Sequence, residues 1–563
     1  MADMLEIEEA DQFRVRAYRR AAQSLENLSE DISAQVERGD DLTKLPGIGK
    51  NMAEKIHELV KTGKLKQLEK LKKETPEELT EIMQIPGLGP KKVEKMYEEL
   101  HIDSVDDLRE AVQQHKLQDL EGFGEKTEEK IRIELERFRK DGKKERTSLV
   151  RAEEYARPLV EMLQKIKGVD KVVVAGSYRR RKETVGDLDI LVTCKNSKPV
   201  MDNFTGYDDV KEVVSQGSTR STVIMRSGLQ VDLRVVPQES YGAALQYFTG
   251  SKQHNIRLRD RANEFKLKIN EYGVFRQGKE KSIAGATEEE VYKTVDLPYI
   301  EPEMREDQGE IDAAVKNKLP TLISLQDLKG DLHTHTNYTD GGTSLREMVE
   351  AARDFGHEYI AITDHSKRVT IAGGLDEKEL AEELEEIDKL QDDFSDIRIL
   401  KGCEVDILDD GKLDLPDSIL KKLDLTVCSV HYKFNLSREK QTKRILKAMD
   451  NPNFNILAHP TGRQLPERGE MDLDLESIMD AALERGCYLE LNSTPKRLDL
   501  KDIYCRMAKE RGLKLSISTD AHSTNSLKFL RYGIDQARRG WLEPDDVLNT
   551  RSVKDLLKLL KRK

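Results

Sequence analysis

The sequence contains few cysteines and no long apolar run. Five cysteines are spread over 563 residues and no two of them form a Cys-x-x-Cys pair, so neither a disulfide framework nor a zinc ribbon is expected. No apolar run approaches the roughly 18 residues that a membrane helix needs, and the first residues lack the basic-then-apolar pattern of a signal peptide. The sequence therefore predicts a cytoplasmic protein with no membrane partner.

The sequence also lacks an excess of positive charge, which at first argues against a nucleic-acid partner. The net charge is −12, but it is unevenly distributed along the chain. Residues 1–300 contain 53 Lys and Arg against 55 Asp and Glu, whereas residues 301–563 contain 41 against 51. The near-neutral first part can still present basic stripes to phosphates, so DNA remains a candidate partner.

The length and composition predict several packed domains. A prior of about one domain per 100–200 residues gives about three to five. The chain is 37% hydrophobic and 36% charged, which is enough apolar material for packed cores beneath a charged surface. Disorder throughout the chain is therefore not expected.

Three segments of the first 140 residues share one pattern: an apolar residue, a glycine–apolar–glycine turn and the start of a helix with a lysine nearby. They are LPGIGKNMAEKI (45–56), IPGLGPKKVEKM (85–96) and LEGFGEKTEEKI (120–131). The glycines allow a tight turn whose amides, with the following helix, can face a phosphate. The pattern resembles the helix-hairpin-helix motif, and this resemblance implies DNA-backbone binding at Gly47, Gly49, Gly87, Gly89, Gly122 and Gly124.

A group of acidic residues follows in a region of predicted strands. Asp187 and Asp189 are two residues apart in DLDILVT, so both side chains leave the same face of a strand. Asp232 lies in the next predicted strand, LQVDLRVV. Three converging carboxylates repel one another unless cations lie between them, and two Mg²⁺ ions would satisfy them and support an in-line phosphoryl transfer. The alternative is a set of solvated strand-end aspartates.

The surrounding residues favour the catalytic interpretation. Gly176 and Ser177 follow the predicted strand KVVVA, and Ser177 and Arg180 are suited to hold a triphosphate. The order GS, GDLDIL, VDLRVV and YFTGS (247–251) resembles the palm and thumb of family X DNA polymerases. That resemblance implies catalytic metal ligands at Asp187, Asp189 and Asp232, and nucleotide-binding residues at Arg146, Gly176, Ser177, Arg180, Tyr247, Phe248, Gly250 and Asn255.

The resemblance also implies that Arg259 contacts the template side. One departure is Lys252, which stands directly after YFTGS where family members often carry an acidic residue. A positive charge there could strengthen phosphate or template contacts.

FRVRAYRRAA (13–22) followed by LPGIGKNMAEKI resembles the small lyase domain of the same family, in which a lysine forms a Schiff base with an abasic sugar. The matching residue is Lys55. Arg14 and Asn51 stand where lysines are often found in active lyases. Two interpretations remain open: Lys55 is the lyase nucleophile, or it only binds a 5′-phosphate, which the two departures favour.

From residue 328 onward, short apolar strands alternate with charged helical stretches, a pattern that predicts parallel βα units closing into a barrel. Nine potential metal ligands lie at or just beyond the ends of these strands: His333, His335, Asp340, His365, Glu404, His431, His459, Asp520 and His522. In a βα barrel this end of the strands is the catalytic face. Nine ligands exceed the need of one ion and suit two or three ions with mixed nitrogen and oxygen ligation, which favours Mn²⁺ or Zn²⁺.

The order HTH, Asp, His, Glu, His, His and DAH resembles the polymerase-and-histidinol-phosphatase (PHP) domain, with all nine positions filled. The two resemblances together imply a multidomain α/β chain: helical helix-hairpin-helix domains, a polymerase β-like α+β palm and thumb, and a distorted TIM-like (βα)7 PHP barrel. The expected boundaries are 1–80 and 81–140 for the two helical domains, 141–235 for the palm, 236–315 for the thumb, 316–327 for a linker and 328–563 for the barrel.

The implied function is gap-filling DNA synthesis in base-excision repair by a monomer that takes DNA with a 5′-phosphate end and dNTPs. The PHP domain would add a Mn²⁺-dependent 3′→5′ exonuclease, with abasic-site cleavage or 3′-end cleaning as a further possibility. Two alternatives remain open. The barrel could be a small-molecule phosphatase, which needs a pocket for one phosphomonoester rather than an open groove. The whole chain could instead be a DNA-end-binding scaffold with inactive sites, against which the complete ligand sets argue.

Overall fold

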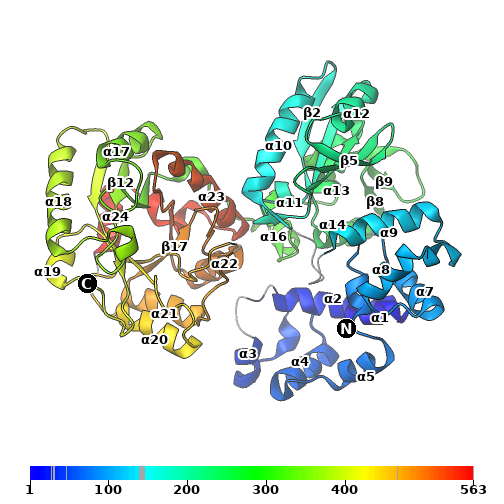
Figure 1. Cartoon of the computed structure of the whole chain (residues 1–563), viewed down its shortest axis with the longest axis horizontal. Coiled ribbons are helices and arrows are strands. Elements are labelled where there is room, and N and C mark those ends of the chain that lie inside the picture. Colours follow the sequence, from blue (N-terminus) through cyan, green and yellow to red (C-terminus); the bar gives the residue numbers. More distant parts are fainter. Residues whose placement is uncertain are drawn as a thin grey trace. The chain divides into compact units, whose positions relative to one another are not determined.

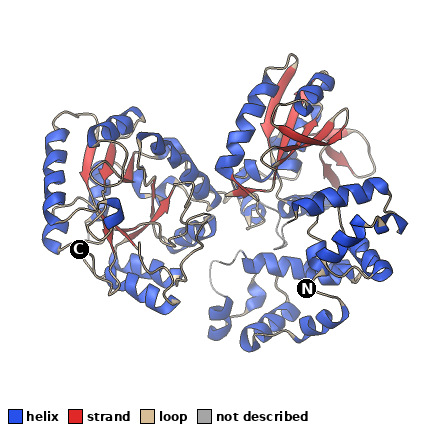
Figure 2. Ribbon diagram, in the orientation of Figure 1, coloured by secondary structure: helices blue, strands red, loops and turns tan. Residues whose placement is uncertain are grey.

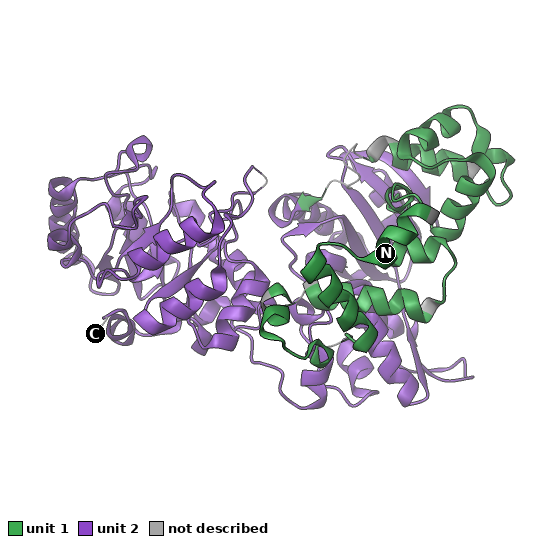
Figure 3. Cartoon of the chain, turned by 90° about the horizontal axis from the view of Figure 1, so that it is seen from below, with its two compact units in different colours: residues 1–147 green, residues 148–563 purple. Residues whose placement is uncertain are grey.

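The computed structural model describes residues 1–26, 28, 32–45, 47–85, 87–138, 146–465 and 467–561. The chain forms two compact units, residues 1–147 and residues 148–563, which Figure 3 shows in different colours. No helix in the described part of the chain combines the length and the apolar character that crossing a bilayer requires. None of the five cysteines, all of them described, lies in a disulfide bond.

The first unit is helical, as predicted (Figure 2). Its α-helices are α1 (Ala2–Ile7), α2 (Gln12–Glu26), α3 (Ile32–Arg38), α4 (Lys50–Thr62), α5 (Lys66–Glu74), α6 (Leu79–Ile82), α7 (Pro90–Leu100), α8 (Val105–Gln113) and α9 (Glu125–Arg137). A capping box between Ser104 and Asp107 starts α8.

The structure contains the three predicted glycine hairpins. The first glycine of each has a positive φ that favours glycine: Gly47 (75°), Gly87 (90°) and Gly122 (89°). The second glycine of each is the N-cap of the following helix: Gly49 for α4, Gly89 for α7 and Gly124 for α9. The free amides of each helix start therefore follow the turn directly, as backbone phosphate binding requires. Pro46 and Pro86, within two of the segments, lie outside the described residues.

The second unit begins with a five-stranded sheet in the order β2-β4-β7-β6-β5. Its strands are β2 (Val169–Val174), β4 (Asp187–Cys194), β5 (Val210–Gln216), β6 (Arg220–Met225) and β7 (Gln230–Val235), and its helices are α10 (Leu149–Gln164), α11 (Gly176–Arg179) and α12 (Ser197–Thr205). A two-stranded sheet pairs β1 (Thr147–Ser148) with β3 (Thr184–Val185). Strands β5 and β6 were not predicted from the sequence. They lie between β4 and β7 along the chain, so Asp232 is not on the strand that directly follows β4.

Strand β4 uses its two faces differently, because successive side chains of a strand alternate. Leu188, Ile190 and Val192 point into the core shared with α10 and α12. Leu191 lies on the opposite face, where it packs with residues of α13. Asp187 and Asp189 share that second face by their spacing, away from the main core. Helices α10 and α12 lie beside the strands of this sheet (Figure 1).

The next region, residues 241–315, combines helices with a small antiparallel sheet, β10-β9-β8. Its elements are α13 (Tyr241–Thr249), α14 (Lys252–Glu264), β8 (Leu267–Asn270), β9 (Gly273–Arg276), β10 (Ser282–Ala284), α15 (Glu288–Lys293) and α16 (Glu310–Val315). Its core includes Leu258, Val274, Val291 and Tyr292.

Parallel strands alternate with helices in the remainder, as the sequence pattern predicts. The strands are β11 (Gly330–Thr334), β12 (Tyr359–Ile362), β13 (Arg398–Lys401), β14 (Glu404–Asp406), β15 (Val427–Ser429), β16 (Ile456–Leu457), β17 (Tyr488–Asn492) and β18 (Leu515–Ser518). The helices are α17 (Leu345–Asp354), α18 (Glu377–Gln391), α19 (Asp417–Leu420), α20 (Arg438–Ala448), α21 (Leu475–Arg485), α22 (Asp502–Arg511), α23 (Leu530–Arg539) and α24 (Val553–Leu560).

These strands form two parallel sheets, β11-β12-β13 and β14-β15-β16-β17-β18. Isolated parallel bridges join the two sheets, one between Thr334 and Ala521 and one between His365 and Glu404. Within the segment IRILKGCEV (397–405), the strand is interrupted at Gly402 and Cys403, so that β13 and β14 follow each other closely. The strands thus follow one another in chain order, and the Thr334–Ala521 bridge connects the first strand to the last.

The barrel packs directly against the preceding region within the second unit. Tyr532 of α23 is buried in the core of the five-stranded sheet. Trp541, just after α23, is buried in the core around α15. Helix α24 buries Leu556 and Leu560 against the barrel.

Candidate active sites

The three aspartates of the first site lie on adjacent strands. Strands β4 and β7 are parallel, and Asp189 is directly opposite Asp232 in their register. Val231 and Leu233, on either side of Asp232, point into the main core, so Asp232 shares the free face with Asp187 and Asp189. The three carboxylates therefore lie on one face of two adjacent strands, and their role as metal ligands stays a prediction.

The loop after β2 brings the backbone close to these acids. Gly176 starts the short helix α11 with φ +63°, and a Cβ atom at this position would lie 2.8 Å from Asp189 Oδ2. The amide of Ala175 donates a 2.7 Å hydrogen bond to the carbonyl oxygen of Asp189. Only glycine fits here, because any side chain would collide with the carboxylate.

The environment of the acids favours a bound cation. Burial, with the nearby Asp187 and Asp232, raises the pKa of Asp189 to about 7. Asp232 accepts hydrogen bonds from Thr222 Oγ1 (2.6 Å) and Gln230 Nε2 (2.7 Å), which hold its carboxylate in place. Because the charged form of Asp189 is unfavourable, divalent cations between the three carboxylates would stabilise it.

Replacing Asp189 with asparagine is expected to stabilise the metal-free protein. Because the pKa of Asp189 is raised to about 7, its charge disfavours folding above that pH, and this cost disappears as pH falls towards the unfolded-state pKa of about 4. We expect D189N to increase the free energy of unfolding by about 1–3 kcal/mol at pH 8 with EDTA present, and by much less at pH 5.

Denaturant unfolding at the two pH values measures the effect, with D202N, an exposed position on α12, as the control. An equal gain at both pH values would contradict the electrostatic explanation.

The predicted sugar- and base-binding residues lie at the junction of α13 and α14. Tyr247 and Phe248 pack edge to face with ring centroids 5.1 Å apart, and Gly250 ends α13 with φ +70°. Asn255 donates to the carbonyl oxygen of Tyr247 (2.7 Å), and Arg259 donates to the carbonyl oxygen of Asn255 (3.2 Å). Hydrogen bonds thus connect Tyr247, Asn255 and Arg259 to one another.

Arg180, one of the predicted triphosphate residues, is held by a carboxylate and a backbone carbonyl group. Arg180 lies in the nucleotide loop, which starts at Gly176. It donates from Nε to Glu306 (3.0 Å) and from Nη1 to the carbonyl oxygen of Thr249 (2.5 Å), so its guanidinium connects this loop to Glu306 and to the turn before Gly250. Arg146 belongs to the first unit, so its place at the triphosphate stays a prediction. Glu306 is a partner of Arg180 that the sequence analysis did not identify.

The second site brings the nine predicted ligands together at the ends of the barrel strands. Three groups of side chains have ligand atoms that lie within 4.8 Å of one another and could each hold an ion: His335, Asp340, His365 and His522; His333, His335 and Asp520; and His365, Glu404 and His431. The ninth ligand, His459, lies 3.0 Å from Glu404.

Glu404 is the centre of this site. Its two carboxylate oxygens lie within 3.5 Å of five imidazoles: His365 (2.9 Å), His459 (3.0 Å), His333 (3.4 Å), His431 (3.4 Å) and His335 (3.5 Å). Glu404 is fully buried and begins strand β14. A carboxylate that lies close to so many ligands is suited to bridge metal ions.

The imidazoles themselves carry the signature of a metal site. Buried nitrogen atoms of His333 (Nε2), His335 (Nδ1 and Nε2) and His459 (Nδ1) have no hydrogen-bond partner among the described residues. Burial, with the neighbouring His365 and His522, lowers the pKa of His335 to about 4, which keeps this imidazole neutral and able to ligate. Unpartnered buried nitrogens are costly, so the residues fit divalent ions.

Two further acids orient these ligands and were missed by the sequence analysis. Glu490 of β17 accepts from His333 Nδ1 (2.7 Å) and from the amide of His459 (2.7 Å). Asp406 lies 3.2 Å from His431 Nδ1. Such partners fix the ring orientation of metal-binding histidines. The available signals were the motif YLELN, on a strand to which no ligand had been assigned, and the second acid of GCEVD.

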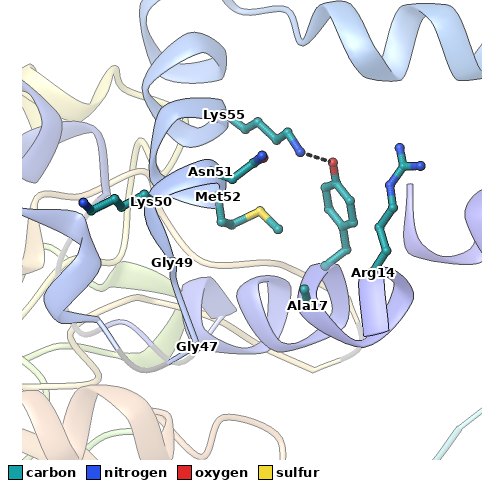
Figure 4. Close-up of a pocket in the computed structure, with 9 residues that line it drawn as sticks. Arg14, Ala17, Gly47, Gly49, Lys50, Asn51, Met52 and Lys55 are labelled. Atoms are coloured by element: carbon teal, nitrogen blue, oxygen red, sulfur yellow. Dashed lines mark hydrogen bonds between the residues drawn. The ribbon is translucent and has the colours of Figure 1, made fainter. Parts of the chain in front are cut away.

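The first unit contains a pocket of about 340 Å³ around Lys55 (Figure 4). It is lined by Arg14, Ala17, Tyr18, Gly47, Gly49, Lys50, Asn51, Met52 and Lys55. Lys55 Nζ donates a 2.6 Å hydrogen bond to the hydroxyl of Tyr18, whose own proton goes to Gln67 (2.8 Å). The predicted Arg14, Asn51 and Lys55 thus surround one cavity, and three cations line it.

The first site, with three acids beside a helix that starts at a glycine, is that of a nucleotidyltransferase. The second site, a circle of histidines and acids at the ends of the barrel strands, is that of a metal-binding PHP barrel. Family models match accordingly: a helix-hairpin-helix domain (1–65), a SAM-like helix-hairpin-helix tandem (39–101 and 80–137), the DNA polymerase beta palm (151–246) and thumb (244–306), and the PHP domain (331–494).

One relative, the DNA polymerase/3′-5′ exonuclease PolX of Bacillus subtilis (strain 168), is 39% identical over the whole chain and 98% of its own length. The chain therefore belongs to the family X DNA polymerases that carry a PHP domain. A probable phosphatase of Thermoanaerobacter sp. (strain X514) is 32% identical over 41% of the chain and 96% of that protein. Another, from Clostridium acetobutylicum, is 28% identical over 34% of the chain and 78% of that protein.

Proposed function

We propose that this protein is a template-directed DNA polymerase that fills short gaps in base-excision repair, and that its PHP domain is a 3′→5′ exonuclease. The observation that carries the proposal is the register of Asp189 beside Asp232, next to a loop that approaches the acids only because Gly176 has no side chain. The Bacillus subtilis relative, whose name states both activities, aligns over the whole chain.

In the polymerase site, Asp187, Asp189 and Asp232 would hold two Mg²⁺ ions. When bound, such a pair activates a 3′-hydroxyl and stabilises the leaving pyrophosphate. Ser177 and the amides at the start of α11 would bind the triphosphate, with Arg180 at its side and Arg146 from the preceding segment. Tyr247, Phe248 and Gly250 would pack against the sugar and exclude a 2′-hydroxyl. Asn255 would contact the base edge, and Arg259 would contact the template.

In the PHP site, the nine ligands would hold two or three ions of Mn²⁺ or Zn²⁺, with Glu404 as the bridging carboxylate. When bound, such ions activate water towards a phosphoester. Glu490 and Asp406 keep the imidazoles of His333 and His431 oriented towards the ions.

A phosphatase activity of the barrel is the second candidate, because probable phosphatases align with this part of the chain alone. Labelled single-stranded DNA and histidinol phosphate, each supplied with Mn²⁺, test the two possibilities. Digestion of the DNA from its 3′ end, without release of phosphate from histidinol phosphate, supports the exonuclease. The reverse result would establish the phosphatase. Cleavage at an abasic site in duplex DNA would add the endonuclease activity that the metal cluster could also support.

We further propose that the protein acts as a cytoplasmic monomer on gapped DNA with a 5′-phosphate end. The three hairpins would bind the DNA backbone at Gly47, Gly49, Gly87, Gly89, Gly122 and Gly124, and the pocket around Lys55 would receive the 5′-phosphate. The six-part division of the chain at residues 80, 140, 235, 315 and 327 also stays a proposal. Its order of domains agrees with that of the family-model matches, whose palm and thumb meet near residue 245 rather than at residue 235.

Lys55 allows a test of lyase chemistry. We expect borohydride to trap little or no covalent complex between the protein and an incised abasic site, because Asn51 contributes no positive charge to the pocket. We also expect K55A to weaken binding of a gapped substrate that carries a 5′-phosphate by about 10-fold, and to change binding of the 5′-hydroxyl substrate little.

Fluorescence anisotropy with the two DNAs measures binding, and K61A, on the same helix but outside the pocket, is the control. Strong trapping that K55A abolishes would assign the lyase to this residue. Equal losses on both DNAs would contradict phosphate recognition.

A further inference from the structure

Helix α23 of the PHP barrel faces the nucleotide loop of the polymerase. Three of its residues, spaced four apart, contact polymerase residues. Arg531 forms an ion pair with Glu153, and Asp535 forms one with Arg181 (3.3 Å). Arg539 donates a hydrogen bond to the backbone carbonyl oxygen of Arg180. Residues at this spacing share one face of a helix. A stripe of α23 therefore lies along helix α10 and the loop that starts at Gly176.

Arg539 makes the most extensive contact of this stripe. Its Nη1 donates to the carbonyl oxygen of Arg180 (2.7 Å) and to Glu306 (3.1 Å), and its Nη2 donates to Asp502 of α22 (2.6 Å). The Arg539 side chain is 2% exposed. Although burial opposes it, the carboxylates of Asp502 and Glu306 raise the pKa of Arg539, so its charge is permanent.

Glu306 connects this arginine to the side chain of Arg180. One carboxylate oxygen, Glu306 Oε1, accepts from both Arg180 Nε (3.0 Å) and Arg539 Nη1 (3.1 Å). The far edge of the Arg180 guanidinium is held by the carbonyl oxygen of Thr249 (2.5 Å). Arg539 thus fixes both the backbone of Arg180 and the carboxylate that orients its side chain.

We propose that Arg539 is a positioning residue for nucleotide binding: the PHP domain holds the polymerase's triphosphate arginine in place without touching the nucleotide. The proposal rests on the assignment of Arg180 to the triphosphate made above. A guanidinium suits this role because its rigid fork places donors on two nitrogens, Nη1 towards Arg180 and Glu306 and Nη2 towards Asp502, whereas a lysine has its three donors on one nitrogen. A misplaced Arg180 would bind dNTP more weakly while leaving the acids that carry the chemistry unchanged.

The neighbouring Arg538 provides a matched control. It donates to Glu303 (2.8 Å) and to the carbonyl oxygen of Ile323 (3.1 Å). It therefore joins the same helix to the same segment, residues 301–306, but contacts no group of Arg180. Loss of Arg538 removes an ion pair between the barrel and the segment 301–306 but leaves the contacts of Arg539 with Arg180 and Glu306 in place.

The test is single-nucleotide incorporation by the full chain on gapped DNA, with dNTP titrated at saturating Mg²⁺. We expect R539Q to raise the KM for dNTP by about 10-fold or more and to lower kcat by a smaller factor. R539K should raise the KM by an intermediate factor, because it keeps the charge but not the three contacts. R538Q should leave the KM unchanged. Digestion of single-stranded DNA and the unfolding temperature are measured for each variant to confirm that it is folded.

An unchanged KM in R539Q, or an equal rise in R538Q and R539Q, would overturn the proposal. If R539Q does not fold, an unchanged KM in R539K overturns it instead. R180Q separates this outcome from failure of the proposed function. If R180Q leaves the KM unchanged, the triphosphate assignment is wrong. If R180Q raises the KM and the Arg539 variants do not, only the positioning role is wrong.

Discussion

Replacing Asp189 with alanine is expected to reduce nucleotide incorporation by about 1,000-fold or more, because the metal ions that we propose it helps to hold would contribute several kcal/mol to stabilising the transition state. Asp189 lies opposite Asp232 on the adjacent parallel strand and closest to Gly176, where the triphosphate would enter. Neither neighbour can replace it, since each carboxylate reaches the ions from its own strand position. Primer extension on gapped DNA under single-turnover conditions measures the loss.

Two controls separate lost chemistry from lost folding. D202A, on α12 against the other face of the sheet, should incorporate nucleotide at the normal rate. D189A itself should bind gapped DNA as tightly as the unmodified protein, and it should still digest single-stranded DNA. If D189A retains incorporation, the acids are not the catalytic centre. If it loses DNA binding as well, the comparison reports unfolding and D189N replaces it.

Replacing Glu404 with glutamine is expected to reduce 3′→5′ digestion by about 1,000-fold or more while leaving incorporation intact, since its loss removes several kcal/mol of metal-based stabilisation. The carboxylate of Glu404 lies within 3.5 Å of five imidazoles. An amide cannot bridge cations through two charged oxygens, so at least one ion should also be lost. Digestion of end-labelled DNA and elemental analysis of the purified protein measure both effects.

The matched control is E358Q. Glu358 is an exposed acid that pairs with Lys329 (2.7 Å) just before strand β12, at the end of the strands away from the ligands. It should leave both digestion and metal content unchanged. Full digestion by E404Q with a normal metal content would show that Glu404 is a structural acid rather than a bridging ligand.

Local patterns predicted those parts of the sites that depend on spacing within one element. Asp187 and Asp189 share a face because side chains alternate along a strand. The glycine hairpins were predicted because a positive φ at Gly47, Gly87 and Gly122 requires glycine. The strand-end histidines were predicted because parallel strands of a barrel end on one face.

Features that depend on contacts between distant segments could not be predicted in the same way. Strand β4 pairs with β7, although β5 and β6, two strands that were not predicted, lie between them in the sequence. Arg180 meets Glu306 and Arg539 across 126 and 359 residues of sequence. Glu490 joins the metal site only because β17 lies beside β16 in the barrel. No local pattern encodes such neighbours, because tertiary packing determines them.

The central claim is that the chain carries two separate centres of phosphate chemistry, and one assay tests it directly. A labelled primer on a template is incubated with dNTPs, Mg²⁺ and Mn²⁺, and the products of D187A and H333A are compared on one gel. The account predicts that D187A only shortens the primer and that H333A only extends it. If either folded variant lost both activities, or if either kept both, the assignment of the two sites would be contradicted.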